Sequence, residues 1–401
     1  MRLGKALYTS RGEVLLARGV ELTDEYVGRI RERGFHFVYV MDGLADEVEP
    51  MGLISDRLRA SAINNIQVMY DLMAEASQVV RDQVAAEGAH VLREVPLAIG
   101  PAVARRLDRL DHDVEVLLEE TLETRTLSGI ASLKSYDNYT FEHSVDVAFY
   151  GVALGRRLSL DRSYLRDLAL GCLLHDIGKM YVDERILNKP GKLDPDEFEQ
   201  IKQHTVLGFH MLRQTPISSP YPAHVALQHH ERQEGGGYPR GLFGTNKIFR
   251  TDRERFDPYR IHLLAELAAV ADVCSALASD RPYRAALPPT EVVRVLRQLA
   301  GHHLNAEALN AFLSMTPSYP VGMHVRVQGG RYDGCYGVVT RVRPATPDRP
   351  DVRLLVDRWG RSLPADCDIG LAQQPGSVEL VAVPESGLSV EEYACRVAST
   401  A

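Results

Sequence analysis

The sequence contains no run of eighteen or more apolar residues, so it lacks a segment long and apolar enough to cross a bilayer as a helix. The first residues, 1–8, also lack the charged and apolar pattern of a signal peptide. We therefore expect a cytoplasmic protein without a membrane span.

Cysteine is scarce, and the cysteines never form a CxxC pair. The five residues are Cys172, Cys274, Cys335, Cys367 and Cys395. An odd, scattered set predicts free thiols that are buried as small apolar side chains. No cysteine stands where a structural zinc site would need it.

An excess of basic charge is absent too: the chain has 46 Lys and Arg residues and 54 Asp and Glu residues, which gives a net charge of −8. This balance argues against a polynucleotide partner but is compatible with a small anionic ligand in a local positive pocket. Hydrophobic residues at 45% and charged residues at 25% are typical of globular proteins, and 401 residues predict two or three folded units.

The N-terminal half of the chain divides into two segments by its patterns. Residues 1–50 predict a small α/β module with strands at 6–8, 13–16 and 35–41, a turn at 10–12 and a helix over 23–33. Residues 51–126 predict amphipathic connecting helices over 54–86 and 101–126, joined near 88–100. Their apolar stripe is typical of a core face, and a homodimer interface is the alternative.

The remainder also divides into two segments. Residues 127–316 have helical periodicity, interrupted by one Gly- and Pro-rich stretch at 235–258. Residues 317–401 predict a small β-rich domain with strands at 325–327, 337–342 and 352–357 and turns at 329–330 and 333–334. The expected fold is thus mainly α, with a central all-helical domain between a small α/β module and a small β domain.

Histidines gather in the helical segment. Five of the fourteen, His143, His175, His204, His229 and His230, occur there in patterns, several of them beside Asp or another His. One such histidine alone is more often a hydrogen-bonded core or surface residue. Together with Asp176 and Asp272 they supply the number of ligands that two divalent ions need, with positions left for water and substrate.

Both aspartates follow apolar runs, at 168–174 for Asp176 and at 267–271 for Asp272. A buried carboxylate is costly unless it is paired or bound to a metal ion, so these positions favour cations. Mixed nitrogen and oxygen ligands favour iron, manganese or another first-row ion.

Basic residues near these ligands suggest phosphate chemistry. Lys179 follows His175 by one helical turn, and Arg281 and Arg284 follow Asp272. Arginine suits bidentate contacts to phosphate, and lysine suits a single oxygen. Solvated charges on a helix face are the alternative.

The motifs together resemble the HD-GYP subgroup of HD-domain metal-dependent phosphohydrolases over about residues 137–313. They occur in the family order: His143-Ser144, His175-Asp176-Ile177-Gly178-Lys179, His204-Thr205, His229-His230-Glu231, Gly237-Tyr238-Pro239, Ala271-Asp272-Val273 and Ser279-Asp280-Arg281-Pro282-Tyr283-Arg284.

The resemblance implies a phosphodiesterase that hydrolyses cyclic di-GMP to linear pGpG, and in some members onward to GMP, through a metal-bridging hydroxide that attacks phosphorus. It implies catalytic roles for Asp176, as the bridging ligand, and for Lys179. The implied metal ligands are His143, His175, Asp176, His204, His229, His230 and Asp272. The implied substrate contacts are Lys179, Gly237, Tyr238, Pro239, Arg281 and Arg284, with the 237–239 loop also contacting partner proteins.

The sequence departs from the family pattern in three places. Tyr139 stands where members with a third metal have Glu, so two metal ions are expected. Residues 273–275 replace the usual aromatic and acidic pair. The stretch 241–264 is longer than in compact members and carries Arg250, Arg253, Arg255 and Arg260, which predicts either a lid or a solvated surface loop.

Other functions stay open at this point. One is hydrolysis of another cyclic dinucleotide, such as a mixed GMP-AMP ring, or of a simpler phosphoester. Another is a non-catalytic sensor that binds nucleotide or partner proteins, against which the seven intact ligand positions argue.

Overall fold

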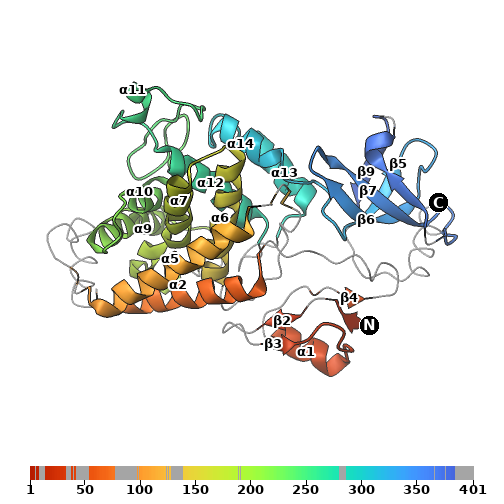
Figure 1. The fold of residues 1–401 in the computed structure, drawn as a ribbon, viewed down its shortest axis with the longest axis horizontal. Coiled ribbons are helices and arrows are strands. Elements are labelled where there is room, and N and C mark those ends of the chain that lie inside the picture. Colours follow the sequence, from red (N-terminus) through yellow and green to blue (C-terminus); the bar gives the residue numbers. More distant parts are fainter. Residues whose placement is uncertain are drawn as a thin grey trace.

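The chain is mainly α-helical, with small sheets towards both ends (Figure 1). The computed structural model describes residues 1–4, 6–8, 14–32, 38, 40–41, 54–76, 97, 99–122, 124, 126–127, 139–187, 189, 191–279, 286–364, 366–374 and 376–383. The expected fold class is confirmed. No helix in these ranges combines the length and hydropathy of a bilayer-spanning segment.

In the N-terminal segment, β2, β3, β4 and α1 lie within the ranges predicted for strands and helix, whereas β1 was not predicted. Residues 35–37 and 39 of the third predicted strand lie outside the described residues. Strand β1 pairs with β4 and β2 with β3, both antiparallel, around Leu3, Leu7 and Ile30. The predicted turn at 10–12 lies outside the described residues. The elements are β1 (Arg2–Leu3), β2 (Leu7–Tyr8), β3 (Val14–Leu16), α1 (Asp24–Glu32) and β4 (Val40–Met41).

The helical centre follows. Its elements are α2 (Asp56–Ala76), α5 (Pro101–Glu120), α6 (Tyr139–Arg157), α7 (Arg162–Leu174), the 3-10 helix η2 (Ile177–Tyr181), α8 (Glu184–Leu187), α9 (Pro195–Gln214), α10 (Tyr221–Gln228), α11 (Asp252–Arg255), α12 (Leu263–Leu277), α13 (Pro289–Leu299) and α14 (Ala306–Leu313).

Two predictions about these helices need correction. The helix expected over 101–126 ends at Glu120. There Arg156 of α6 donates to the Leu118 carbonyl, which a further helical turn would need as an acceptor, and the Leu122 N–H donates to Glu119 instead. The region 139–315 is also interrupted at more places than 235–258. Asp194 starts α9 with a capping box, and Gly301, at φ 86°, follows the end of α13 in the left-handed conformation. The part of the first connecting helix expected beyond Ala76 lies outside the described residues.

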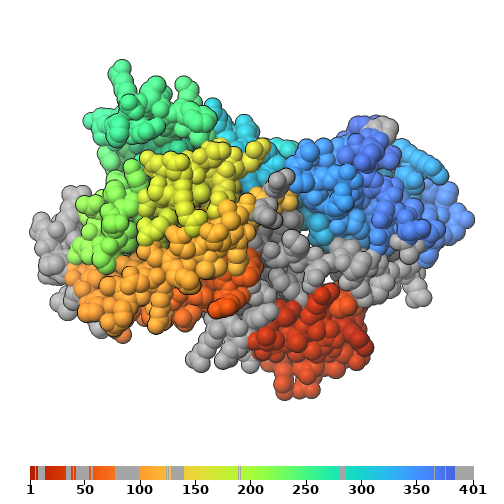
Figure 2. Space-filling view, viewed as in Figure 1, coloured from red at the N-terminus to blue at the C-terminus, as the bar shows by residue number. Residues whose placement is uncertain are grey.

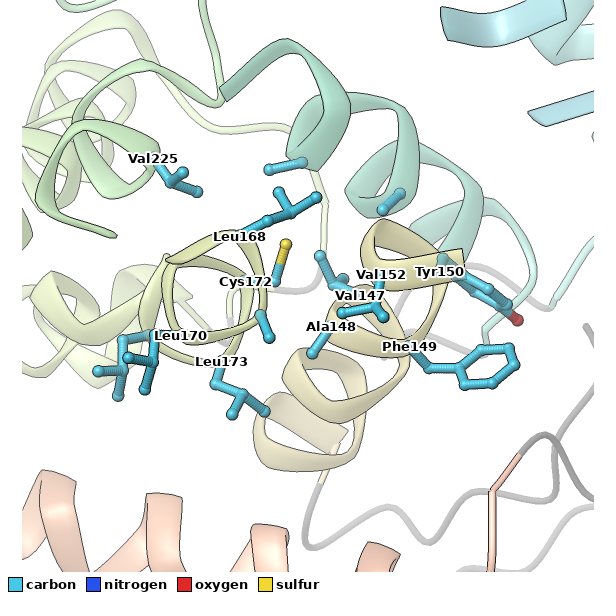
Figure 3. Close-up of a cluster of buried hydrophobic side chains, with 14 of the residues drawn as sticks. Val147, Ala148, Phe149, Tyr150, Val152, Leu168, Leu170, Cys172, Leu173 and Val225 are labelled. Carbon is cyan, nitrogen blue, oxygen red and sulfur yellow. The ribbon is translucent and has the colours of Figure 1, made fainter. Parts of the chain in front are cut away.

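One apolar core joins α2 and α5 to the helices that follow them. Figure 3 shows its middle, where Val147 and Val152 of α6 face Leu168 and Cys172 of α7. Gly151 permits this approach, because an added Cβ would lie 3.0 Å from the Cys172 sulfur. The connecting helices therefore bury their apolar stripes against the helical centre, as a core face does. The homodimer interface stays a prediction.

The C-terminal segment forms an antiparallel five-stranded sheet in the order β8-β7-β6-β5-β9, with its own apolar core. It makes a separate lobe in Figure 2 (blue). Sequence reasoning found β5, β6 and the end of β7 but missed β8 and β9. Gly329, Gly330 and Gly334 adopt positive φ angles at the predicted turns. The strands are β5 (His324–Gln328), β6 (Tyr336–Arg343), β7 (Thr346–Val356), β8 (Asp368–Gly370) and β9 (Glu379–Ala382).

Cysteines are free in the described residues, as predicted. Cys172, Cys274 and Cys335 are buried, but Cys367 is only partly buried, which corrects the expectation for that residue. Cys395 lies outside the described residues.

Candidate metal centre

The seven predicted ligands come from five separate stretches of the helical centre and meet in its interior. Six are buried and His230 is partly buried. Their nitrogen and oxygen atoms form two groups, each within 4.8 Å: His143 with His175 and Asp176, and His204 with His229 and His230. Asp272 joins the first group, because its Oδ1 lies 3.0 Å from His143 Nε2.

Gly178 allows two of these stretches to meet. A Cβ at this position would lie 2.0 Å from the carbonyl oxygen of His204 and 2.6 Å from the nitrogen of Gly208. The backbone of η2, which follows Asp176, therefore packs directly on α9, which carries His204. Sequence reasoning used this glycine only as part of a motif, whereas its physical role is the absence of a side chain.

Hydrogen bonds orient three of the imidazole rings. The Nδ1 atoms of His175, His204 and His229 lie 2.7, 2.6 and 2.9 Å from the carbonyl oxygens of Cys172, Ile201 and Ala226, each three residues earlier in the chain. A carbonyl oxygen only accepts, so each Nδ1 carries the proton. Each Nε2 then presents a lone pair to the centre, as in metal-ligating histidines.

These lone pairs converge without a proton between them. His204 Nε2 lies 3.4 Å from His229 Nε2, and Asp176 Oδ1 lies 3.4 and 3.8 Å from the same two atoms. Asp176 Oδ1 is buried and has no hydrogen-bond partner in the described residues. Ligands at about 2.0–2.2 Å from one ion are separated by distances of this order. The donor set therefore fits a divalent cation.

Asp176 lies between the two groups. Its Oδ2 is 3.2 Å from His175 Nε2 and 2.5 Å from the Lys179 ammonium, while its Oδ1 faces His204 and His229. Burial alone would raise the pKa of Asp176, but His175 and Lys179 hold that pKa well below its ordinary value. The carboxylate is thus charged and presents one oxygen to each group, the arrangement that a bridging ligand requires.

Burial keeps most of the imidazoles neutral. It lowers the pKa of His204 to about 4 and that of His229 to about 3, and it holds the pKa of His230 well below the ordinary value. For His175 burial acts in the same direction, but the adjacent Asp176 outweighs it and raises the pKa. Neutral imidazole is the form that binds metal ions.

Ser275 gives a physical meaning to one departure from the family pattern. Its Oγ lies 2.9 Å from His143 Nδ1, so it supports the ring whose Nε2 faces Asp272. Burial would raise the pKa of Asp272, yet the contact with His143 keeps that pKa well below its usual range. Sequence reasoning missed this role, although Ser275 lies one helical turn after Asp272 on the same face of α12.

The loop containing Gly237, Tyr238 and Pro239 lies against the second group of histidines. The Tyr238 ring stacks on His230 with centroids 4.7 Å apart. A Cβ on Gly237 would lie 2.5 Å from the Glu231 Cα, so only glycine fits there. The buried Glu231 carboxylate accepts the backbone N–H groups of Arg240 and Leu242, both at 2.8 Å, and thereby fixes the loop.

A cleft of about 630 Å³ lies beside this loop. Phe198 in its wall is 45% exposed and contacts the Tyr238 ring edge-on at 6.0 Å. Lys202 lies over both rings. The other lining residues are Ile186, Leu187, Lys189, Gly191, Lys192, Leu193, Asp194, Pro195 and Ile201.

The remaining basic candidates differ in their surroundings. Lys179 pairs with Asp176 inside the centre, whereas Arg281 and Arg284 lie outside the described residues, as does the side chain of Tyr139. The long stretch 241–264 was predicted to be a lid or a solvated surface loop. Arg250 fits neither prediction, because it pairs with the buried Glu266.

The other arginines of that stretch lie nearer the surface. Arg260 donates to the Gly244 carbonyl at 2.8 Å, and Arg253 and Arg255 are exposed on α11. The stretch is therefore anchored to α12 through Arg250 and Glu266, whereas Arg260 bonds within the stretch.

Comparison with known proteins identifies the family of the part of the chain that carries these residues. Residues 130–308 match the sequence profile of the HD domain family. This part of the chain is an HD domain. It contains all seven candidate ligands, and the resemblance that the motifs indicate is confirmed for it.

Relatives of this HD domain include proteins named as phosphodiesterases. A cyclic di-GMP phosphodiesterase of Pseudomonas aeruginosa is 40% identical over 205 residues, which cover 51% of this chain and 46% of the relative. One of Thermotoga maritima is 36% identical over 182 residues, or 45% of each chain. A 3′3′-cGAMP-specific phosphodiesterase of Vibrio cholerae is 32% identical over 194 residues, 48% of this chain and 41% of the relative. The matched region spans less than half the length of these relatives.

Proposed function

We propose that this chain is a metal-dependent phosphodiesterase that hydrolyses cyclic di-GMP to linear pGpG. In this proposal the seven candidate ligands hold two metal ions. The observation that carries the proposal is the buried Asp176 carboxylate, which presents one oxygen to each of two groups of imidazoles. The names of the relatives from Pseudomonas aeruginosa and Thermotoga maritima support the substrate.

The proposed metals are two divalent ions, iron or manganese. Asp176 is the shared ligand. His143, His175 and Asp272 would complete one position, and His204, His229 and His230 the other. Bound ions of this kind activate water near neutral pH and neutralise charge on phosphoryl oxygens. Only nitrogen and oxygen ligands meet here, a set that suits first-row ions.

The side chains of this protein would supply orientation and charge. Attack of water oxygen on phosphorus breaks the bond to the sugar 3′-oxygen, which leaves with a proton and opens the ring. Lys179 places a cation beside Asp176, where it can contact a phosphoryl oxygen as charge develops. We propose Arg281 and Arg284 as further phosphate contacts.

The cleft beside Tyr238 is the proposed position of a nucleobase. Phe198 is an exposed aromatic residue in its wall, and the lining is mainly apolar with Lys189 and Lys192 among it. Base stacking on aromatic side chains contributes about 1–3 kcal/mol per base. We therefore propose that Gly237, Tyr238 and Pro239 place the substrate between this cleft and the metal centre.

A mixed GMP-AMP ring is the second candidate substrate, favoured by the relative from Vibrio cholerae. It has the same phosphodiester linkages in a ring, so the site chemistry would be unchanged and the base contacts would decide.

The remaining proposals concern the whole chain. Because cyclic di-GMP is a bacterial second messenger, we propose a cytoplasmic location. Partner proteins at the 237–239 loop, a homodimer, onward hydrolysis to GMP and the division into segments 1–50, 51–126, 127–316 and 317–401 are further proposals.

The test is hydrolysis of a panel of cyclic dinucleotides by protein loaded with Mn²⁺ or Fe²⁺, with products separated by chromatography. We expect cyclic di-GMP to give pGpG, and Asp176→Ala protein to give no product. Faster turnover of the mixed GMP-AMP ring would show that this ring is the preferred substrate, and the proposed reaction type would stand. Folded, metal-loaded protein that hydrolyses no member of the panel would overturn the proposal.

A further inference from the structure

Helix α2 lies outside the matched HD domain, yet it packs against the elements that form the metal centre. The HD domain begins at residue 130, whereas α2 covers Asp56–Ala76. It contacts α6, which carries His143, and η2, which directly follows Asp176. Figure 1 shows α2 (orange) running along one side of the helical centre. A side chain from α2 can therefore reach the site.

A buried ion pair fixes α2 in this position. Arg59 Nη1 lies 2.9 Å from Asp146 Oδ1, and the Asp146 side chain is 1% exposed. Asp146 follows His143 by one helical turn, so the pair joins α2 to the part of α6 that carries a candidate ligand. Breaking a buried ion pair leaves an uncompensated charge, which opposes displacement of α2.

Tyr70 lies on the same face of α2 as Arg59, because eleven residues make about three helical turns. Its ring packs edge-on against Phe141 at 5.2 Å, two residues before His143. The Tyr70 hydroxyl is buried and has no hydrogen-bond partner in the described part of the chain. A buried hydroxyl without a partner is rare because its desolvation is uncompensated, so this one needs an explanation.

The candidate bridging carboxylate has a matching property. Asp176 Oδ1 is also buried without a hydrogen-bond partner among the described residues. The contact of α2 with η2, which directly follows Asp176, brings Tyr70 to the same side of the centre. Burial and then the charge of Asp176 raise the pKa of Tyr70 well above its ordinary value. The hydroxyl is thus protonated at neutral pH and available as a donor. What the hydroxyl lacks is an acceptor among the described residues.

We propose that the Tyr70 hydroxyl donates a hydrogen bond to an oxygen of the phosphate group that binds at the metal centre beside Asp176. Helix α2 then completes a site whose other residues all belong to the HD domain. The identity of the phosphate as part of a cyclic dinucleotide rests on the proposed function, whereas the contact itself does not.

The test compares Tyr70→Phe with wild type in three measurements. Removing an unpaired hydroxyl should raise the melting temperature of metal-free protein by about 2–4 °C. Elemental analysis should show unchanged metal content. With Mn²⁺ bound, the dissociation constant for inorganic phosphate and the turnover of cyclic di-GMP should each worsen by about 10- to 100-fold, the loss expected for a hydrogen bond to a charged group. Higher stability with weaker phosphate binding is a combination that a structural tyrosine would not give.

Tyr164→Phe is the matched control. Tyr164 lies near the start of α7, at the opposite end from His175, and its hydroxyl bonds to Tyr221. Its loss should not raise the melting temperature and should leave phosphate binding unchanged.

Phosphate affinity that is equal in wild type and Tyr70→Phe would overturn the inference, and so would loss of metal from the variant. If wild-type protein hydrolyses no cyclic dinucleotide, the proposed function fails. Phosphate binding and melting temperature would still decide the role of Tyr70 in that case.

Discussion

The helical centre and the C-terminal sheet region differ in what they bury. Among the described residues, every buried polar or charged side chain lies between Asn65 and Thr316. The core of the sheet region instead consists of apolar side chains such as Val325, Val339 and Leu354. Buried polar groups are costly unless they are paired, so their concentration in one region indicates that binding or catalysis is located there.

Within the helical centre, pairing separates structural polar groups from the candidate site. Asp113 is buried, but its two oxygens accept hydrogen bonds from Ser61 at 2.7 Å and from Asn65 at 2.6 Å. Asp176 is equally buried, yet its Oδ1 has no hydrogen-bond partner in the described residues. A buried oxygen without a hydrogen-bond partner therefore predicts a bound ligand better than burial of the carboxylate alone.

The largest expected effect tests this difference between two buried aspartates. Asp176→Ala should lose both of the proposed metal ions and reduce turnover at least about 1000-fold, because the proposed shared ligand of both positions would be gone. Asp113→Ala should be less stable but keep its metal. Elemental analysis of folded protein is the measurement. Two metal ions per chain in the Asp176 variant would show that this carboxylate is not a bridge.

Two glycines allow the same steric change to be made in each region. An added Cβ would lie 2.0 Å from the His204 oxygen at Gly178, and 2.3 Å from the Arg353 oxygen at Gly337 in β6. Gly178→Ala should separate η2 from α9 and lower both metal content and stability, by about 3 kcal/mol or more. Gly337→Ala should destabilise the sheet region and leave metal content unchanged. Loss of metal in both variants would mean that the sheet region also maintains the centre.

The sequence predicted those parts of the site that appear as patterns of neighbouring residues. His175-Asp176 and His229-His230 are adjacent pairs, and Asp272 follows an apolar run, so their chemistry is visible in a short window. The three missed strands, β1, β8 and β9, have two to four residues, too short for an alternating pattern to be recognised.

Long-range packing supplied what the sequence did not reveal. Gly178 matters because the α9 backbone touches it, Ser275 because it meets a ring from α6, and Tyr70 because α2 docks beside η2. These contacts leave no pattern in the sequence, because the two partners of each contact are separated by 26 or more positions along the chain. The end of α5 is hidden for the same reason, because Arg156 of α6 donates to the Thr121 hydroxyl and the Leu118 carbonyl there.

A smaller effect separates phosphate chemistry from metal storage within the helical centre. Lys179 is a protonated amine that cannot ligate a cation, so Lys179→Ala should keep its metal content. Turnover should fall about 30- to 1000-fold, because a contact to a phosphoryl oxygen is lost. Lys247→Ala, at an exposed position, is the control. Steady-state kinetics on metal-matched protein measure the effect, and wild-type kinetics for the Lys179 variant would contradict the proposed contact.

The smallest expected effect concerns pH and distinguishes the two regions once more. His262 precedes α12, its Nδ1 accepts the Leu264 N–H at 3.2 Å, and its ring stacks on Tyr221 at 4.7 Å. Burial lowers the pKa of His262 to about 4. Between pH 4 and the ordinary value of about 6.5, the unfolded chain binds more protons than the folded one. The stability from this cap is therefore present above pH 6.5 and is lost as the pH falls towards 4.

His262→Asn keeps an acceptor at the start of α12 but does not titrate. We expect metal-free wild type to lose about 2 kcal/mol more stability than this variant between pH 7 and pH 5, because each pH unit between the two pKa values costs about 1.4 kcal/mol. Urea unfolding followed by circular dichroism reports the helices. The single tryptophan, Trp359, lies in the sheet region, so its fluorescence transition should not differ between wild type and variant. Equal pH dependence of the helical transition in both proteins would show that His262 does not titrate with folding. A shift of the Trp359 transition by the substitution would instead show that the polar helical centre and the apolar sheet region unfold together.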